Sequence, residues 1–219
     1  MVTVRLTMLC ATAAPGSQDG LFGNGSPGER GRRELAAAKA ALPPYSRALR
    51  APSAHCARIA EALAVDATPE NVLRDLDYGV WDGRPPEDIA AEDPHGFSTW
   101  LTDPDAVPHG GESVGRLCRR TESWLKELPA DAGSVLTITE AAVIRAALVH
   151  VLSVPVRSFW HLRVPALSTV TLTLRDGLWN ARLGQPVAER RPARADDSPP
   201  VAVLAMPATR QPLCLAGRP

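Results

Sequence analysis

A chain of 219 residues is long enough for one well-formed core, so we expect one domain followed by a tail. Its 24 basic and 24 acidic residues balance, which excludes the concentrated positive field that nucleic-acid binding needs. Four cysteines without paired short spacing predict neither a zinc knuckle nor a disulfide framework, and a reducing cytoplasm is the expected location. No apolar stretch is long enough to span a membrane, and the N-terminal apolar run is too short for a signal peptide.

The first third of the chain alternates between strand and helix patterns. Short β-branched runs predict strands, and apolar residues at helical spacing predict the helices between them. Ser53 is a plausible helix N-cap. In chain order we expect a strand over Val2–Cys10, a loop over Pro15–Pro27, a helix from Gly28 to Pro43, a strand over Ser46–Ala51 and a helix from Ser53 to Ala64.

The middle of the chain carries acids and aromatic residues before a long helix. Leu73–Gly83 mixes acidic side chains with Tyr78 and Trp81 and ends in turn residues. Two short helices are expected after it, over Glu87–Glu92 and Gly96–Leu101, and a turn-rich segment follows. Apolar residues on one side then predict a helix over Glu112–Leu128.

A strand that feeds directly into a helix follows, and it points to a ligand site. Val135–Thr139 is a short buried strand pattern, and from Ala141 the apolar residues recur at helical spacing until Pro155. The turn between the two elements lies at the carboxyl end of the sheet, where open α/β proteins bind their ligands. Glu140 occupies that turn and is therefore a candidate functional residue.

The chain closes with strands and a segment of different composition. Strands are expected over His161–Val164, Val170–Arg175 and Leu178–Leu183, the last two joined by a hairpin turn at Asp176-Gly177. Pro, Arg, Asp and Ser dominate from Gln185 onward. We expect Pro186–Pro219 to be a mostly disordered tail, with docking of its apolar patch, Val201–Met206, as an edge strand left open.

Five motifs in a fixed order point to a family. They are Pro27–Arg33 for an L-T-E-x-G helix start, Ala60–Leu63 for T-A-E, Leu73–Gly83 for L-x-E-x-x-F-G-x-W-E-G, Gly110–Ser113 for G-G-E-S and Val143–Ala146 for V-I-R-A. With these, residues 2–184 resemble the histidine phosphatase superfamily, the phosphoglycerate-mutase-like proteins. The resemblance implies an α/β fold, a three-layer α/β/α sandwich in a domain over residues 1–185, with a small helical cap over about 84–109.

The residues that carry the family's chemistry differ in this chain. The first strand of the family ends in R-H-G-E-T, where the histidine becomes phosphorylated, and Cys10 and Ala11 stand in the places of its arginine and histidine. The second pocket arginine, in S-P-L-x-R-A, falls on His55, and the second histidine, in S-H-G, falls on Glu140. Asp75 stands for the glutamate of the family.

These differences weaken the expected phosphate pocket. Phosphoryl transfer depends on positive charge around the phosphate oxygens. An ionised Glu140 about 4 Å from phosphate would replace attraction by a repulsion of about 4 kcal/mol. Alanine also offers no nucleophile. We therefore expect a degenerate member that lacks both catalytic histidines and is not competent for phosphohistidine chemistry.

Several functions stay open for such a site. The favoured one is a repurposed enzyme of isomerase, lyase or hydrolase type, in which Glu140, Asp75 and His55 move protons on a small non-phosphorylated substrate. Alternatives are a non-catalytic pseudophosphatase that binds a metabolite or protein, and a residual phosphatase that uses Cys10 or a water. Two further possibilities stay open. One is a thiolate–imidazole pair of Cys10 with His55, and the other is a zinc ion bound by Cys10, His55, Asp75 and Glu140.

The remaining site predictions concern binding. We expect a small-molecule ligand, no metal, no cofactor, no nucleic acid and no membrane. The predicted binding residues are Cys10, Ala11, Arg58, His109, Glu112, Ser113 and Thr139.

Overall fold

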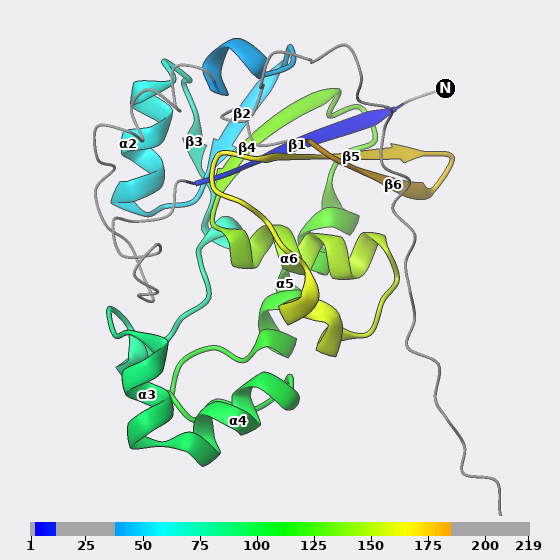
Figure 1. The fold of residues 1–219 in the computed structure, drawn as a ribbon. Helices are drawn as coiled ribbons and strands as arrows, with labels where there is room; N and C mark the ends of the chain where they lie inside the picture. Colours follow the sequence, from blue (N-terminus) through cyan, green and yellow to red (C-terminus); the bar gives the residue numbers. More distant parts are fainter. Residues whose placement is uncertain (1–2, 12–37, 185–219) are drawn as a thin grey trace, which may run out of the picture. The chain divides into compact units, whose positions relative to one another are not determined.

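A six-stranded mixed sheet forms the centre of the fold (Figure 1). The computed structural model describes residues 3–11 and 38–184. The strands follow the order β3-β2-β4-β1-β5-β6. Their bounds are β1 Val4–Cys10, β2 Arg47–Arg50, β3 Thr68–Pro69, β4 Ser134–Thr139, β5 Thr169–Arg175 and β6 Leu178–Leu183.

Parallel pairing brings several strand ends to one edge of this sheet. β1 pairs in parallel with β4, and β4 pairs in parallel with β2, whereas β5 runs antiparallel to β1. In the β1–β4 register Cys10 lies opposite Thr139. The turns that follow β1, β2 and β4 therefore leave the sheet at the same edge.

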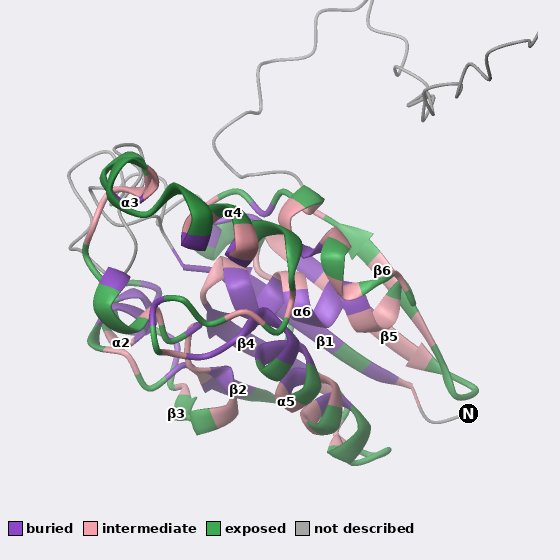
Figure 2. Cartoon of the chain, turned by 90° about the horizontal axis from the view of Figure 1, so that it is seen from below, coloured by how far each residue is buried: buried purple, intermediate pink, exposed green. Residues whose placement is uncertain are grey.

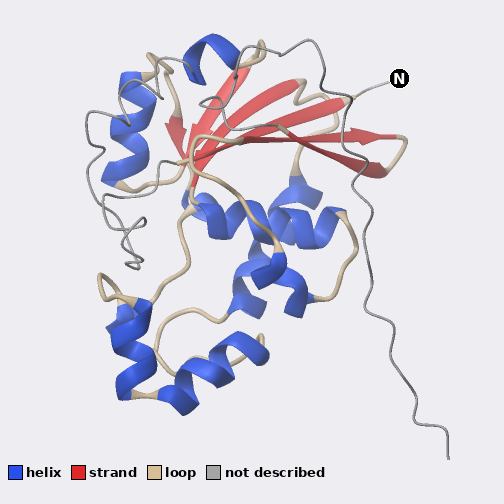
Figure 3. Cartoon of the chain, in the orientation of Figure 1, coloured by secondary structure: helices blue, strands red, loops and turns tan. Residues whose placement is uncertain are grey.

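Helices cover both faces of the sheet, which confirms the predicted α/β architecture. The main ones are α2 (Ala54–Ala62), α5 (Val114–Glu127) and α6 (Ala141–Val151). The connection from β2 through α2 leads outward to the edge strand β3. The connection from β3 through α5 leads back in the opposite direction, past β2, to β4. Because such crossovers are right-handed, α2 and α5 lie on opposite faces. Helix α6 packs beside α5 (Figure 3).

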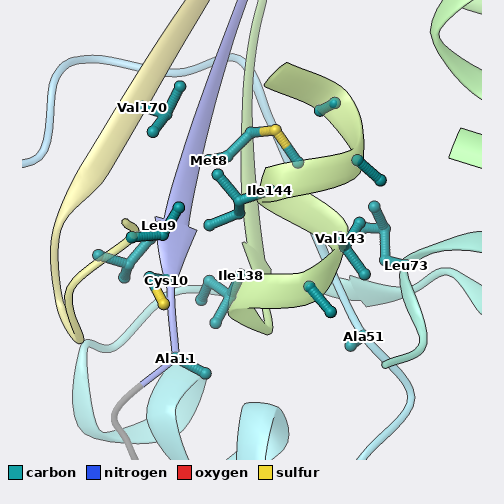
Figure 4. Close-up of a cluster of buried hydrophobic side chains, with 14 of the residues drawn as sticks. Met8, Leu9, Cys10, Ala11, Ala51, Leu73, Ile138, Val143, Ile144 and Val170 are labelled. Atoms are coloured by element: carbon teal, nitrogen blue, oxygen red, sulfur yellow. The ribbon is translucent and has the colours of Figure 1, made fainter. Parts of the chain in front are cut away.

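The apolar residues of the two central strands and of α6 form the core. Met8, Val143 and Ile144 meet on the side of the sheet that α6 covers, whereas Leu9 points to the other side of β1 (Figure 4). Figure 2 shows that burial concentrates in these elements, whereas α3 and β6 are largely exposed. Two central strands buried on both faces account for the near-continuous apolar runs in the sequence.

Two short helices after β3 lie in the range predicted for the cap, α3 (Pro86–Glu92) and α4 (Pro94–Thr102). Three 3₁₀ turns, η1 (Asn71–Leu73), η2 (Gly79–Trp81) and η3 (Val156–His161), accompany them. Trp100 of α4 packs against Trp81 of η2 and Trp160 of η3, with ring centroids 5.5 and 4.2 Å apart. This aromatic cluster joins the α3–α4 segment to the rest of the fold. No helix of the described ranges is long and apolar enough to cross a membrane.

Some sequence predictions differ from the structure. The strand expected over His161–Val164 is wrong: the chain forms η3 up to His161, and the carbonyl of Leu162 accepts a bond from the Arg145 side chain instead of a strand neighbour. The two-residue strand β3 was not predicted, because Thr68–Pro69 is too short to show alternation. The predictions for the loop Pro15–Pro27, for the start of the following helix and for the tail Pro186–Pro219 with its patch Val201–Met206 lie outside the described residues.

Gly79 is predicted to be a position where any side chain destabilises the protein. Its φ is +50°, and a Cβ there would overlap the carbonyl oxygen of His109. Gly83 is a matched control, with φ +73° and open space where a Cβ would lie. Both alanine variants carry the strain of about 1–2 kcal/mol expected for a left-handed residue. In urea titrations Gly79→Ala should lose clearly more free energy of unfolding than Gly83→Ala. Equal losses would contradict this crowding argument.

Candidate functional site

The ends of β1 and β4 bring four predicted site residues together. Cys10 ends β1 opposite Thr139, and the N–H of Ala11 donates to the Thr139 carbonyl at 2.7 Å. Glu140 follows at once as the N-cap residue of α6. Figure 4 shows Cys10 and Ala11 at this end of β1. The strand-turn-helix pattern in the sequence thus places Glu140 as expected.

The segment that carries Asp75 is tied to the same strand end. The hydroxyl of Thr139 donates to the Leu73 carbonyl at 2.8 Å, in a buried position. Glu140 and Asp75 lie close enough to influence each other: burial raises the pKa of Glu140 to about 8, and the charge of Asp75 adds to this rise. The two predicted catalytic carboxyl groups therefore form a pair.

The pKa of Asp75 is raised by burial and lowered by a main-chain bond and two nearby cations. Burial raises it to about 6, against the lowering effects of a 2.8 Å bond from the Leu76 N–H and of the charges of Arg120 and Arg145. Burial raises the pKa of both groups, and because the two interact, they take up and lose protons as a pair. One carboxylate and one carboxylic acid side by side can take up and deliver protons.

Cys56 is a site residue that the sequence prediction missed. Its thiol donates to Oε1 of Glu140 at 3.3 Å. The N-cap bond of α2, from the Cys56 N–H to the Ser53 hydroxyl at 3.1 Å, fixes where this thiol lies. A signal existed, since Cys56 follows His55 in the motif that resembles S-P-L-x-R-A, but the sequence does not show which of two adjacent side chains turns toward the sheet.

The structure weakens the idea of a nucleophilic Cys10. Burial, and then the neighbouring Glu140, raise the pKa of the Cys10 thiol well above its usual range. The thiol is therefore protonated at neutral pH, whereas a nucleophile must be a thiolate. His55 is 1% exposed in the first turn of α2, beside Cys56, and its catalytic role stays a prediction.

Arg145 and Tyr78 also belong to the neighbourhood of the carboxyl pair. Arg145 donates to the Leu162 carbonyl at 2.9 Å and lies 5.7 Å from the centroid of the Phe159 ring. Its charge lowers the pKa values of Cys10 and Asp75. Burial raises the pKa of the Tyr78 phenol, and the two carboxylates add to the effect. Both residues were noticed in the sequence, but not as site residues.

Three predicted binding residues have structural contacts of their own. His109 is buried beside the Trp81 ring at 5.1 Å, and its Nδ1 accepts from the Gly111 N–H at 3.0 Å. Glu112 forms a buried ion pair with Arg120 at 2.7 Å. Ser113 is the N-cap residue of α5 and its hydroxyl accepts from the Arg116 N–H at 3.1 Å. A ligand-binding role for each of them stays a prediction.

The binding role predicted for Arg58 stays a prediction, whereas the metal alternative finds no support in the described parts of the chain. Arg58 lies on α2, and no ion pair joins it to Asp75 or Glu140 within residues 3–11 and 38–184. Over the same ranges, no three His, Cys, Asp or Glu side chains are grouped to hold a metal ion.

Comparison with known proteins points to one family. The pattern described as "Histidine phosphatase superfamily (branch 1)" matches residues 28–185. An adenosylcobalamin/alpha-ribazole phosphatase of Salmonella typhimurium is 31% identical over 102 residues, which are 44% of this chain and 50% of that protein. Phosphoserine phosphatase 1 of Hydrogenobacter thermophilus is 27% identical over 119 residues, 53% of this chain and 56% of that protein. The chain thus spans about half the length of these curated relatives.

Solved structures show the same fold. The alpha-ribazole phosphatase of Shigella flexneri superimposes with a TM-score of 0.73 at 19% identity, over 84% of this chain and 97% of that one. A mycobacterial glucosyl-3-phosphoglycerate phosphatase gives a TM-score of 0.70 at 19% identity, over 83% and 98% of the two chains. The predicted phosphoglycerate-mutase-like fold is confirmed.

The predicted function needs correction. We expected a role outside phosphatase chemistry, either as a proton-transfer enzyme or as a pseudophosphatase, but the similar proteins are named as phosphatases. One assumption behind that expectation concerned the charge of Glu140. The argument for phosphate repulsion assumed an ionised carboxylate, whereas burial raises the pKa of this group to about 8.

Proposed function

The chain belongs to the histidine phosphatase superfamily, and on that premise we propose that it hydrolyses a phosphate monoester with the carboxyl pair as its acid and base. The single observation that carries the proposal is the buried carboxyl pair at the end of β4, where the Thr139 hydroxyl ties the Asp75 segment to the strand and burial raises the pKa of both Asp75 and Glu140. Two such groups are ready for opposite roles at neutral pH.

Glu140 is the general acid in this proposal. In its protonated form it carries no charge that repels the phosphate, and it can deliver a proton to the leaving oxygen as the P–O bond breaks. The thiol of Cys56 holds Oε1 at 3.3 Å and so orients the carboxyl group. Glu140 is also the N-cap residue of α6, so the first N–H groups of that helix are available for phosphate oxygens.

Asp75 is the general base, and water is the nucleophile. Ala11 and a protonated Glu140 occupy the places in which the family resemblance expects histidines, and neither offers a nucleophile. In the proposed step, a water oxygen forms the new bond to phosphorus, Asp75 takes the water proton, and Glu140 protonates the departing alcohol. The degenerate character predicted from the sequence then means a changed nucleophile within phosphatase chemistry.

Hydrolysis of phosphoserine and of 4-nitrophenyl phosphate tests this function. We expect release of inorganic phosphate without a covalent phosphoenzyme in rapidly quenched reactions with labelled substrate. A trapped phosphoenzyme would contradict direct attack by water. Absence of turnover with a broad panel of phosphate monoesters would overturn the function itself.

The pH dependence of kcat/KM is a separate prediction. Activity should rise as Asp75 loses its proton near pH 6 and fall as Glu140 loses its proton near pH 8, which gives a maximum at about pH 7. Because the two groups interact, the two limbs report apparent pKa values of the pair. A profile of 4-nitrophenyl phosphate hydrolysis from about pH 4.5 to 9.5 measures both limbs. A profile without an alkaline limb would exclude a proton-donating Glu140.

A further inference from the structure

The guanidinium of Arg120 is paired with Glu112 in the interior of the fold. Its Nε donates to Oε1 of Glu112 at 2.7 Å, and its Nη2 donates to Oε2 at 3.0 Å. The two side chains are only 13% and 7% exposed. Burial of a fork-shaped, two-bond ion pair makes the position of Arg120 well defined.

Nη1 and Nη2 of Arg120 also donate to the main chain around Asp75. Nη1 donates to the Val72 carbonyl, and Nη2 donates to the carbonyls of Arg74 at 2.8 Å and Asp75 at 3.0 Å. These three carbonyls lie within four residues, from Val72 of η1 to Asp75 itself. A single side chain from α5 thus holds the turn that carries Asp75, over a sequence separation of 45 residues.

We infer that Arg120 is a positioning residue for the acid–base pair: its guanidinium fixes the main chain at Asp75 and holds a positive charge beside the carboxylate. The catalytic part of this inference rests on the proposed function. A neutral side chain with the same hydrogen bonds would also hold the turn. What distinguishes a positioning role toward the carboxyl pair is the electrostatic effect of the fixed Arg120 charge on Asp75.

The charges around Asp75 come from several elements. Arg120 of α5 and Arg145 of α6 lower the pKa of Asp75, and Arg120 is the stronger of the two cations. Asp82 after η2 raises it, and Glu140 is coupled to it. Among the described residues, Glu112 forms ion pairs with both Arg74 and Arg120, and the buried groups of Cys10, Cys56 and Tyr78 also lie in this neighbourhood.

Four variants separate an effect of the Arg120 charge from a purely structural role of its hydrogen bonds. Arg120→Met removes both the bonds and the charge, and Arg120→Lys keeps the charge but not the fork. Arg119→Met is the matched control, because Arg119 is the next residue of α5 and its ion pair with Asp105 is exposed, at 64% and 70%. Glu112→Gln is the complementary variant, since it leaves the charge of Arg120 without its counter-charge.

The titration of the Asp75 carboxyl, followed by carbon-13 NMR, is the deciding measurement. Arg120→Met should move it to higher pH, Arg120→Lys should leave it near the wild-type position, and Glu112→Gln should move it to lower pH. The acid limb of kcat/KM should move with it, so that Arg120→Met loses several-fold more activity near pH 6 than near pH 8. Arg119→Met should change neither.

Either of two results would overturn the inference. One is an Asp75 titration that is the same in Arg120→Met and wild type, and the other is a shift of equal size in Arg119→Met. If Arg120→Met does not fold, the opposite shift in Glu112→Gln decides in its place. Because the NMR titration needs no turnover, the expected shifts in an inactive wild-type protein would contradict the proposed function and leave the role of Arg120 toward Asp75 intact.

Discussion

Replacement of Glu140 by Gln should lower kcat for phosphoserine by about 10²–10⁴-fold, the usual contribution of a general acid. Glutamine keeps the size and the hydrogen-bonding capacity of the protonated acid but has no proton to give. The serine alkoxide is a poor leaving group, so hydrolysis depends on its protonation. Steady-state kinetics at about pH 7 measures the loss.

The leaving group provides the internal control for Glu140→Gln. 4-Nitrophenolate is stable without a proton, so its release depends much less on an acid, and the loss with 4-nitrophenyl phosphate should be at least about tenfold smaller. Equal losses with both substrates would mean that Glu140 binds or positions the phosphate and does not donate a proton. Cys56→Ala removes the 3.3 Å contact to Glu140 and should give a smaller loss with the same preference between substrates.

The same variant, Glu140→Gln, should be more stable than the wild type in alkaline solution. A carboxyl group with a pKa of about 8 in the folded protein and an ordinary value of 4.5 in the unfolded chain favours the unfolded state progressively as the pH rises between these values. The glutamine amide does not titrate, so urea titrations at about pH 9 should show a gain for Glu140→Gln that is absent at about pH 4. A variant that is no more stable at about pH 9 would contradict the raised pKa.

The local patterns of the sequence were enough to predict much of the fold. The strand Val135–Thr139 and the helix from Ala141 appear as β4 and α6, and the hairpin at Asp176-Gly177 joins β5 and β6, with positive φ at both turn residues. These elements show clear periodicity or turn chemistry. The strand predicted over His161–Val164 was wrong because this part of the chain shows no such pattern. Its aromatic residues pack against the α3–α4 segment and α6, and local sequence does not separate a 3₁₀ turn of this kind from a strand.

The sequence predicted that Glu140 and Asp75 lie close together, but it predicted neither the contact of Cys56 nor the raised pKa of Glu140. Glu140 and Asp75 were expected together because each aligns with a motif of the family. The contacts of Cys56 and Arg120 join elements 84 and 45 residues apart, and local patterns carry no information on such pairs. The protonation of Glu140 depends on burial and on Asp75, which only the packed structure defines. An argument from formal charge therefore predicted repulsion of phosphate where the protein can present a neutral acid.

Replacement of Asp75 by Asn tests the coupling between the two groups. Loss of the general base should lower kcat/KM by about 10²–10⁴-fold with both substrates, because activation of water is needed whatever the leaving group. The acid limb should disappear. The charge of Asp75 also raises the pKa of Glu140, so the alkaline limb of the residual activity should move to lower pH.

Asp82→Asn is the matched control for this prediction. Asp82 is another aspartate of the same segment, and it contributes the smallest of the identified effects on the pKa of Asp75. Its replacement should leave kcat nearly unchanged and shift the acid limb only slightly, to lower pH, because a neighbouring negative charge is lost. An alkaline limb that stays in place in Asp75→Asn would mean that burial alone sets the pKa of Glu140. The two carboxyl groups would then act independently, and the acid–base pair on which the proposed mechanism depends would have no electrostatic basis.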